Sequence, residues 1–438
     1  MAGTGGLTPL QRSVLARAEP HLPDAPIVIA LSGGADSAAL AWVVVAAGRQ
    51  ARAVTVDHGL AVSAPLVAAA AEIAARLGLD HEVVAAEGSG TDEGSLRDAR
   101  YAALEAAARP GEVLVGGHTA DDQAETVLGN LLRGAGAGGL SGIPQRRGRW
   151  VRPLLEMERA ETRALAAEAG LPFCDDPDND DPRRRRSRLR TEVIPYLAEA
   201  VNPNVAGALR RAGALAAADD AVLEARAAGV PVRVQGGEAR LPAAWLATLP
   251  EAVAGRVVRA ALRALTGTYP GSARDVGEVL GALGGGGPRP VSGDLLAGRE
   301  GPWLVVYPAG RPEPLPPARL PVPGRARFGG WELTAAAGPE PPAPRPVGRY
   351  HALLAPSEGL EVRAARPGET LAIRDGTKRV VDVLREGGVP SRLRPRWPVL
   401  VAGGRMVWVV GVRVAEPAWA GSGPALLVTA RPAGRGST

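Results

Sequence analysis

The stretch IVIALSGGADS, residues 27–37, joins five apolar residues to a loop of small and hydroxylic residues that contains one aspartate. A strand, a glycine-rich turn and a helix commonly bind phosphate, because the helix N-terminus presents unpaired backbone N–H groups. The loop has no lysine and lacks the GxxxxGK[ST] spacing of a Walker motif. Asp36 would repel phosphates unless a hard cation lay between them, so we expect Asp36 to bind Mg²⁺ that bridges the phosphates. A tight turn with a solvated aspartate is the alternative.

Residues 26–155 alternate short apolar runs with segments of helical periodicity. This alternation predicts an α/β fold, with a parallel sheet covered by helices on both faces. Ligands of such sheets bind at the carboxyl ends of the strands. We therefore expect the loop 32–37, the cluster Asp57-His58-Gly59 and His118 to meet at one edge of the sheet. Beyond the run at 27–31, the apolar runs are 52–57, 81–86 and 112–117, and the helical patterns are 64–78 and 94–109.

Composition adds weaker constraints. The pI of 9.9 favours an anionic partner, but the arginines are spread over the whole chain, as a general coding bias would also produce. A single cysteine, Cys174, excludes an intramolecular disulfide and a cysteine-rich metal site, and we expect it to be a small buried residue. The longest apolar run, 38–48, is too short to span a bilayer, and no secretory signal is recognisable. We expect a cytoplasmic protein that does not contact membranes.

The length of 438 residues suggests two or three domains. We predict a Rossmann-like catalytic domain over 1–205 and a mostly helical middle domain, with Pro-rich connectors, over 206–350. A small α+β domain is predicted over 351–438, where a helix-like segment precedes strand-like runs.

A second motif, GGHTADDQAETVLGNLLRGAGAGGLSGI, occupies residues 116–143. In a helix that begins near residue 120, Asp121 and Glu125 are four residues apart, and Asp122 and Glu125 are three apart. One helical face therefore presents two or three carboxylates near His118. The helix dipole also favours acidic residues in a first turn, but this leaves the rest of the motif unexplained.

These motifs resemble those of known enzymes. SGGADS resembles the PP-loop of the N-type ATP pyrophosphatases, and residues 116–143 closely resemble the signature of the tRNA(Ile)-lysidine synthase family. In two places the sequence departs from that family: Leu60-Ala61 stands where Leu-Arg is common, and Arg186-Ser187 where Arg-Asn is common. Further similar pieces are VDHG (56–59), RDARY (97–101), VRPLL (151–155), the acidic-then-basic stretch 175–197 and the C-terminal stretch 366–411.

The resemblance implies a two-step ATP-dependent reaction on an isoleucine tRNA with anticodon CAU. ATP would adenylate the C2 carbonyl oxygen of cytidine 34, and free L-lysine would then displace AMP to form lysidine. The codon read would change from AUG to AUA. The candidate catalytic groups, if a protein base is needed, are Asp36, His118 and Asp121. The implied ATP-binding residues are Ser32, Gly33, Gly34, Ala35, Asp36, Ser37, Arg97 and Arg100.

The paired carboxylates suit a substrate that carries two ammonium groups. The ε-amine of free lysine has a pKa near 10.4, so only about one molecule in a few thousand is neutral at pH 7. A carboxylate that gripped this group would stabilise its ammonium form and suppress attack. We therefore expect Asp122 and Glu125 to hold the α-ammonium and leave the ε-amine free.

Arginines are the candidates for tRNA binding. Those in the stretch 183–190 could contact tRNA phosphates or the carboxylate of lysine, or could form a solvated loop with the preceding aspartates. Lys378 and its neighbours form a basic set in the C-terminal region, which could bind RNA or simply be a charged surface. The candidates are Arg133, Arg183, Arg184, Arg185, Arg186, Arg188, Arg190, Lys378 and Arg379.

Other functions fit the sequence less well. A tRNA thiolase of the same superfamily typically needs a cysteine pair or a cysteine-bound cluster, which a chain with only Cys174 cannot supply. An amidotransferase-type synthetase would carry or recruit a glutaminase, and no such segment is recognisable. A non-catalytic tRNA-binding protein would not need both the loop 32–37 and the carboxylates of 121–125. A homodimer is compatible with the sequence.

Overall fold

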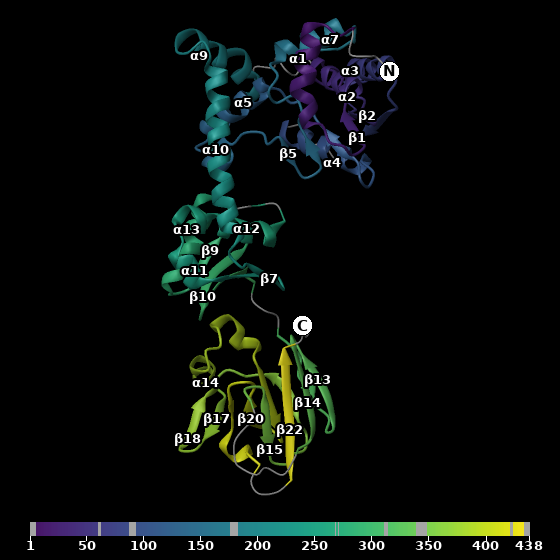
Figure 1. Ribbon diagram of the computed structural model, residues 1–438. Helices are drawn as coiled ribbons and strands as arrows, with labels where there is room; N and C mark the ends of the chain where they lie inside the picture. The colour runs from purple at the N-terminus through teal and green to yellow at the C-terminus, as the bar shows by residue number, and fades with distance from the viewer. Residues whose placement is uncertain are drawn as a thin grey trace. The chain divides into compact units, whose positions relative to one another are not determined.

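The computed structural model divides the chain into two compact units, Met1–Ala225 and Arg226–Thr438, which are described separately (Figure 1). The departure at Leu60-Ala61, the acidic residues 176–181 and the Pro-rich segment 339–347 lie outside the described residues. The described residues are 6–59, 63–86, 93–175, 183–267, 269, 271–310, 314–338, 348–420 and 424–432.

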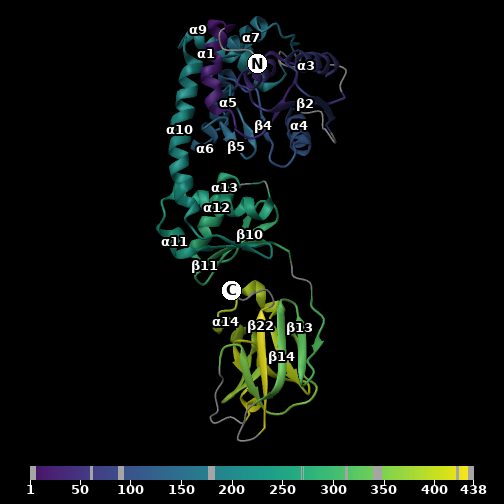
Figure 2. The same cartoon turned by 45° about the vertical axis from the view of Figure 1, so that its right-hand side comes forward.

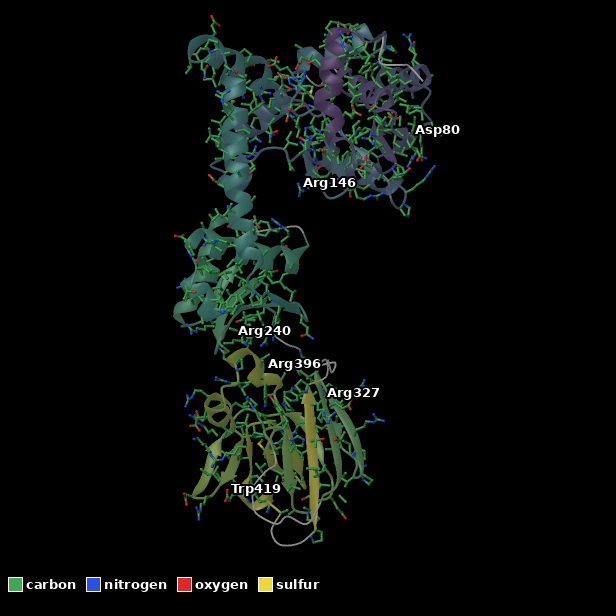
Figure 3. The ribbon with its side chains drawn as sticks, in the orientation of Figure 1. Asp80, Arg146, Arg240, Arg327, Arg396 and Trp419 are labelled. Atoms are coloured by element: carbon green, nitrogen blue, oxygen red, sulfur yellow. The ribbon has the colours of Figure 1, made fainter. Side chains whose placement is uncertain are left out.

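A six-stranded sheet in the order β3-β2-β1-β4-β6-β5 forms the centre of the first unit. All neighbouring strands are parallel except β5 and β6, which confirms the predicted parallel sheet. Figure 3 labels Asp80, just before β3, and Arg146, on β5, which mark the two edges of this sheet. The strands are β1 (Ile27–Ala30), β2 (Ala51–Asp57), β3 (His81–Ala85), β4 (Val113–Val115), β5 (Arg146–Arg147) and β6 (Trp150–Val151).

Helices cover both faces of this sheet. Successive residues of β1 point to opposite faces, and each set packs against a different group of helices. Ile27 and Ile29 pack with α1, α2, α3 and α7, whereas Val28 packs with Leu104 of α4. Figure 2 shows α3 and α4 on opposite sides of β2. None of the helices in the described ranges is long and apolar enough to cross a membrane. The helices are α1 (Pro9–Ala18), α2 (Ala35–Ala46), α3 (Ser63–Leu77), α4 (Glu93–Ala107), α5 (Ala120–Leu131), α6 (Ala137–Leu140), α7 (Arg159–Glu168), α8 (Arg185–Arg188), α9 (Ile194–Ala200) and α10 (Val205–Ala228).

Opposite the loop edge, at the amino ends of the strands, Arg52 of β2 is buried against acidic residues. It donates hydrogen bonds to Glu112 from Nε (2.9 Å) and from a terminal nitrogen (2.8 Å), and another to Glu82 (2.8 Å). Hydrogen bonds from Arg52 lower the pKa of Glu112 to about 2. This ion pair ties β2 to the residue just before β4.

Because the folded-state pKa of Glu112 is depressed, its contribution to stability is full above its ordinary value near 4.5 and is lost as the pH falls toward 2. We expect Glu112→Gln to lower the free energy of unfolding by roughly 3 kcal/mol at pH 7, and by much less at pH 3. Urea midpoints followed by circular dichroism at both pH values measure this. Glu72→Gln, which breaks an exposed pair with Arg76, is the control and should have little effect at either pH. A deficit for Glu112→Gln that is equal at both pH values would contradict the expectation.

The prediction of a mostly helical middle region was wrong. Besides three further helices this region contains a five-stranded sheet in the order β7-β8-β11-β10-β9, whose neighbouring strands are antiparallel. Three of its strands, β7, β8 and β9, are only three to five residues long and each contains an arginine, so they carry little of the alternation that indicates a strand. The elements are β7 (Arg233–Gln235), β8 (Glu238–Pro242), α11 (Ala243–Thr248), α12 (Glu251–Thr266), α13 (Ala273–Gly281), β9 (Arg289–Val291), β10 (Leu295–Glu300) and β11 (Trp303–Pro308).

The C-terminal region is α+β, as predicted, but it begins earlier than residue 351. β13 pairs with β14, and β14 pairs with β22 from Trp331↔Pro432 to Gly338↔Ala425, so strands on both sides of the predicted 350/351 boundary share one sheet and one core. The elements are β12 (Ala318–Arg319), β13 (Gly324–Phe328), β14 (Trp331–Gly338), β15 (His351–Leu354), β16 (Glu361–Ala364), β17 (Thr370–Ile373), β18 (Gly376–Arg379), α14 (Val380–Glu386), β19 (Pro398–Ala402), β20 (Arg405–Val409), β21 (Arg413–Val414) and β22 (Ala425–Pro432).

Candidate active site

The glycine-rich loop joins β1 to α2 in a tightly held turn. Gly33 has φ +84°, and a Cβ at this position would lie 2.1 Å from the carbonyl oxygen of Leu66. The hydroxyl of Ser37 donates to the carbonyl of Gly34 (2.8 Å) and accepts from the N–H of Ser32 (3.2 Å). Gly34 caps α2 and has no side chain to bond the N–H groups of the first turn, and none of the described side-chain hydrogen bonds involves these N–H groups. The loop is therefore shaped to bind an anion at the start of α2.

The carboxyl end of β4 lies against this loop, as expected for the shared edge of the sheet. A Cβ on Gly117 would lie 3.0 Å from the carbonyl oxygen of Asp36, so a larger residue here would have to push the loop backbone away. Cys174 also contacts the loop, through an N–H that donates to the carbonyl of Gly33 (2.9 Å). Cys174 is only half-buried, so its predicted burial was wrong: it lies in the irregular segment after α7, beside the loop, and outside the apolar core.

A residue that the sequence did not single out, Arg159, contacts all four acidic candidates. Its backbone N–H donates to Asp121 (2.7 Å), and one terminal guanidinium nitrogen donates to Asp122 (2.8 Å). The other terminal nitrogen lies 3.3 Å from Glu125, and Nε lies 3.5 Å from Asp36. Arg159 is the first residue of α7, so the start of this helix links the loop to the carboxylates of α5.

Asp36 lies half-buried beside this helix start. The hydroxyl of Thr162 donates to Asp36 and also to the carbonyl of Arg159. Burial raises the pKa of Asp36, against the opposing effects of the Thr162 hydrogen bond and of Arg159. The charged form of Asp36 therefore gains from any additional cation in the site.

Asp122 and Glu125 are buried and face a second group of arginines. Arg186 donates to Glu125 from Nε (2.8 Å) and to Asp122 from a terminal nitrogen (2.9 Å). Arg190 donates to both oxygens of Glu125, at 2.7 Å and 3.1 Å. Burial alone would raise the pKa of Asp122, but Arg186 and Arg159 outweigh it and hold this pKa below its usual value. Both carboxylates are therefore compensated by guanidinium groups in this state.

His118 is half-buried near the start of α5. Burial lowers its pKa to about 4, so the ring is neutral at pH 7. Its Nδ1 has no hydrogen-bond partner among the described residues and packs against Gly116, where an added Cβ would lie 3.3 Å away. His118 thus retains an unused ring nitrogen close to the carboxylates.

A pocket of about 500 Å³ opens beside the carboxylates, between α4, α5 and the segment around α8. Arg97 lies at this pocket with its guanidinium 5.5 Å from the ring centre of Tyr101, and this ring packs on Trp150 at 4.6 Å. The pocket is lined by Gly94, Arg97, Glu125, Thr126, Gly129, Asn130, Arg133, Arg185, Arg186 and Leu189. A cavity with arginines and one carboxylate suits a polar or anionic ligand.

The structure brings most of the candidate residues of the first unit to one region. The remaining arginines lie on elements that border it: Arg100 on α4, Arg183 and Arg184 just before α8, and Arg188 in α8. Lys378 and Arg379 belong to the second unit, where they pair with Glu386 (2.6 Å) and Asp382 (2.9 Å).

Sequence reasoning missed Arg159 and Thr162. A signal was present: both follow β6, so the expectation that functional residues lie at the carboxyl ends of parallel strands applies to them as well. The segment also begins a helix in the pattern Glu158-x-x-Glu161, with a capping box. Applied to β6, the rule would have directed attention to the N-terminus of α7.

Comparisons with known proteins agree with this arrangement. The family model of the PP-loop domain matches residues 7–197, and that of the TilS substrate C-terminal domain matches residues 360–426. The tRNA(Ile)-lysidine synthase of Salinispora arenicola is 44% identical over 279 residues, which cover 60% of this chain and 83% of the relative. The protein of the same name from Thermus thermophilus is 36% identical over 417 residues, covering 90% of this chain and 70% of the relative. The chain therefore belongs to the tRNA(Ile)-lysidine synthase family of enzymes.

Proposed function

We propose that this enzyme uses ATP to join free L-lysine to C2 of cytidine 34 in an isoleucine tRNA with anticodon CAU. The product is lysidine, and the codon read changes from AUG to AUA. The observation that carries the proposal is the link made by Arg159 between the phosphate-binding loop and the buried carboxylates of α5. A site for ATP thereby lies beside a site suited to an ammonium group.

The first step is adenylation of the C2 carbonyl oxygen of cytidine 34. This oxygen attacks the α-phosphate of ATP, and pyrophosphate leaves with the electrons of the broken P–O bond. The N–H groups at the start of α2 and the loop 32–37 stabilise the charge on the departing pyrophosphate. Arg97 and Arg100 would contribute further positive charge.

Asp36 fits the role of a magnesium ligand. Mg²⁺ in phosphate-transfer sites is usually bound by one or two carboxylates together with phosphate oxygens. Asp36 is a half-buried carboxylate whose pKa is raised by desolvation, and it lies at the start of α2 beside the loop. When bound, the cation would neutralise phosphate charge.

In the second step the ε-amine of lysine attacks C2 and AMP leaves with the C2 oxygen. Asp122 and Glu125 would hold the α-ammonium in place of arginine N–H groups. Lysine enters with both an α-ammonium and an α-carboxylate, so a guanidinium released from a carboxylate can bind the carboxylate of lysine. The exchange keeps the buried charges paired, as a low-dielectric site requires.

The nucleophilic amine loses a proton during the attack, and we propose His118 as the base among the three candidates. Asp121 accepts from the backbone of Arg159, and Asp36 is bonded to Thr162. His118 is neutral at pH 7 and has an unused ring nitrogen among the described contacts. The target cytidine would enter the 500 Å³ pocket, where arginine side chains can stack on a base.

The C-terminal region would contribute to tRNA binding, with Lys378 and Arg379 as candidate contacts. We also propose that Arg133 and the arginines of 183–190 that are not engaged with lysine contact tRNA phosphates. A homodimer is compatible with this reading.

Pyrophosphate release tests the proposal. We expect release from ATP and Mg²⁺ to require an isoleucine tRNA transcript with C34, and labelled lysine to enter only this tRNA. A transcript with U34 is the matched control. Release without lysine incorporation would retain adenylation but exclude lysine as the nucleophile. No release with either transcript would favour a non-catalytic tRNA-binding protein.

A further inference from the structure

We propose that Arg159 is a positioning residue that couples occupancy of the ATP site to the affinity of the lysine site. The inference rests on the proposed function, because it takes the loop 32–37 as the site of the ATP phosphates and Asp122 and Glu125 as the site of the lysine ammonium. It adds that one guanidinium serves both sites and that its position depends on which site is filled.

The base of this side chain is fixed. The backbone N–H of Arg159 donates to Asp121 (2.7 Å), and its carbonyl accepts from the hydroxyl of Thr162, which also donates to Asp36. The first turn of α7 is thus anchored to both α5 and α2. The backbone of Arg159 is therefore held in place, and only its side chain can move between the carboxylates of α5 and the loop before α2.

The guanidinium is shared unequally between the two sides. It lies 2.8 Å from Asp122 and 3.3 Å from Glu125, but 3.5 Å from Asp36. In this state it therefore binds mainly to the carboxylates that lysine needs. Side-chain relative exposure is 11% for Asp122 and 2% for Glu125, so an arriving ammonium must replace N–H groups already bonded to them.

Phosphates at the loop would change this balance. Guanidinium groups bind phosphate oxygens strongly and with two parallel hydrogen bonds, and the interaction is strengthened where water is excluded. ATP beside Asp36 would draw the guanidinium of Arg159 away from Asp122 and Glu125, so the α-ammonium of lysine would have one guanidinium fewer to displace from these carboxylates. ATP should therefore tighten lysine binding, and lysine should tighten ATP binding by the same factor.

Arg186 and Arg190 do not offer this coupling in the described contacts. Both pair with Asp122 and Glu125, and neither has a described contact with Asp36. Of the arginines at the two carboxylates, Arg159 alone has a described contact with Asp36 as well.

The test measures lysine binding by calorimetry with and without α,β-methylene ATP, which cannot be cleaved at the reacting bond. For the wild-type protein we expect the analogue to lower the Kd of lysine about 10-fold or more, within the usual range of coupling between sites. We call the Kd of lysine without the analogue, divided by the Kd with it, the coupling ratio. In Arg159→Gln this ratio should fall close to one, because the neutral amide is not attracted to phosphate by charge. Arg159→Lys keeps the charge but loses the planar group that makes two parallel hydrogen bonds, so it should retain only part of the coupling.

Arg76→Gln is the matched control. Arg76 lies on α3 and pairs with the exposed Glu72, away from the carboxylates of α5. Its ratio should equal that of the wild type. Circular dichroism establishes that each variant is folded.

A wild-type ratio of one would overturn the proposal, and so would a full ratio in folded Arg159→Gln. The wild-type ratio decides even if neither Arg159 variant folds. Incorporation of lysine into tRNA by the wild type is measured in parallel. A coupling ratio of one with normal lysine incorporation would contradict only the proposed coupling. Absence of lysine incorporation would contradict the proposed function.

Discussion

Gly33→Ala is expected to reduce tRNA-dependent pyrophosphate release from ATP by at least about 100-fold. A Cβ at this position would lie 2.1 Å from the carbonyl oxygen of Leu66 in α3, and the residue has φ +84°. Backbone on both sides must shift to relieve the overlap, and displacement of preorganised N–H groups typically costs about 10²–10³ in rate. Initial rates with saturating tRNA, over a range of ATP concentrations, measure the loss.

Gly48→Ala separates this clash from the general cost of a left-handed residue. Gly48 lies just beyond the C-terminus of α2, has φ +66° and has open space around its hypothetical Cβ. It should cost about 1 kcal/mol of stability and leave pyrophosphate release near the wild-type rate. Wild-type release from Gly33→Ala would show that the loop does not bind the pyrophosphate.

Glu125→Gln is expected to raise the KM for lysine about 100-fold or more while pyrophosphate release persists. The substitution preserves shape but removes the charge of a carboxylate whose side chain is only 2% exposed. A buried ion pair broken on one side typically loses about 2–5 kcal/mol. Lysine incorporation measured over a range of lysine concentrations gives the KM, and pyrophosphate release with C34 tRNA reports the first step separately.

Glu168→Gln, at the exposed end of α7, is the control for this variant and should leave both readouts unchanged. An unaltered lysine KM in Glu125→Gln would remove this carboxylate from the lysine site. Equal loss of pyrophosphate release and incorporation, with lysine KM unchanged, would place Glu125 in the adenylation step instead.

The local parts of the site could be predicted from the sequence. β1, the loop 32–37 and α2 are contiguous, so a buried run, two glycines and a helical pattern predict them together. The face that carries Asp122 and Glu125 follows from helical spacing alone. The same local patterns predicted the order of strands and helices up to β4.

The non-local parts could not be predicted. The contact of Arg159 with Asp36 joins residues 123 positions apart, and those of Arg186 and Arg190 with Glu125 join residues 61 and 65 positions apart. Sequence patterns describe neighbours along one element, whereas these pairs depend on how α7 and the segment around α8 pack beside α5. For the same reason the pairing of β14 with β22, which moves a domain boundary, left no local signal.

Nucleoside analysis of the tRNA tests the central claim most directly. The enzyme would be incubated with ATP, Mg²⁺, lysine and the C34 transcript of isoleucine tRNA, and the digested tRNA examined by mass spectrometry. The account requires cytidine 34 to be replaced by a nucleoside heavier by one lysine less one water, and unchanged cytidine when ATP or lysine is omitted. An unmodified cytidine 34 in the complete reaction, or lysine attached elsewhere in the tRNA, would contradict it.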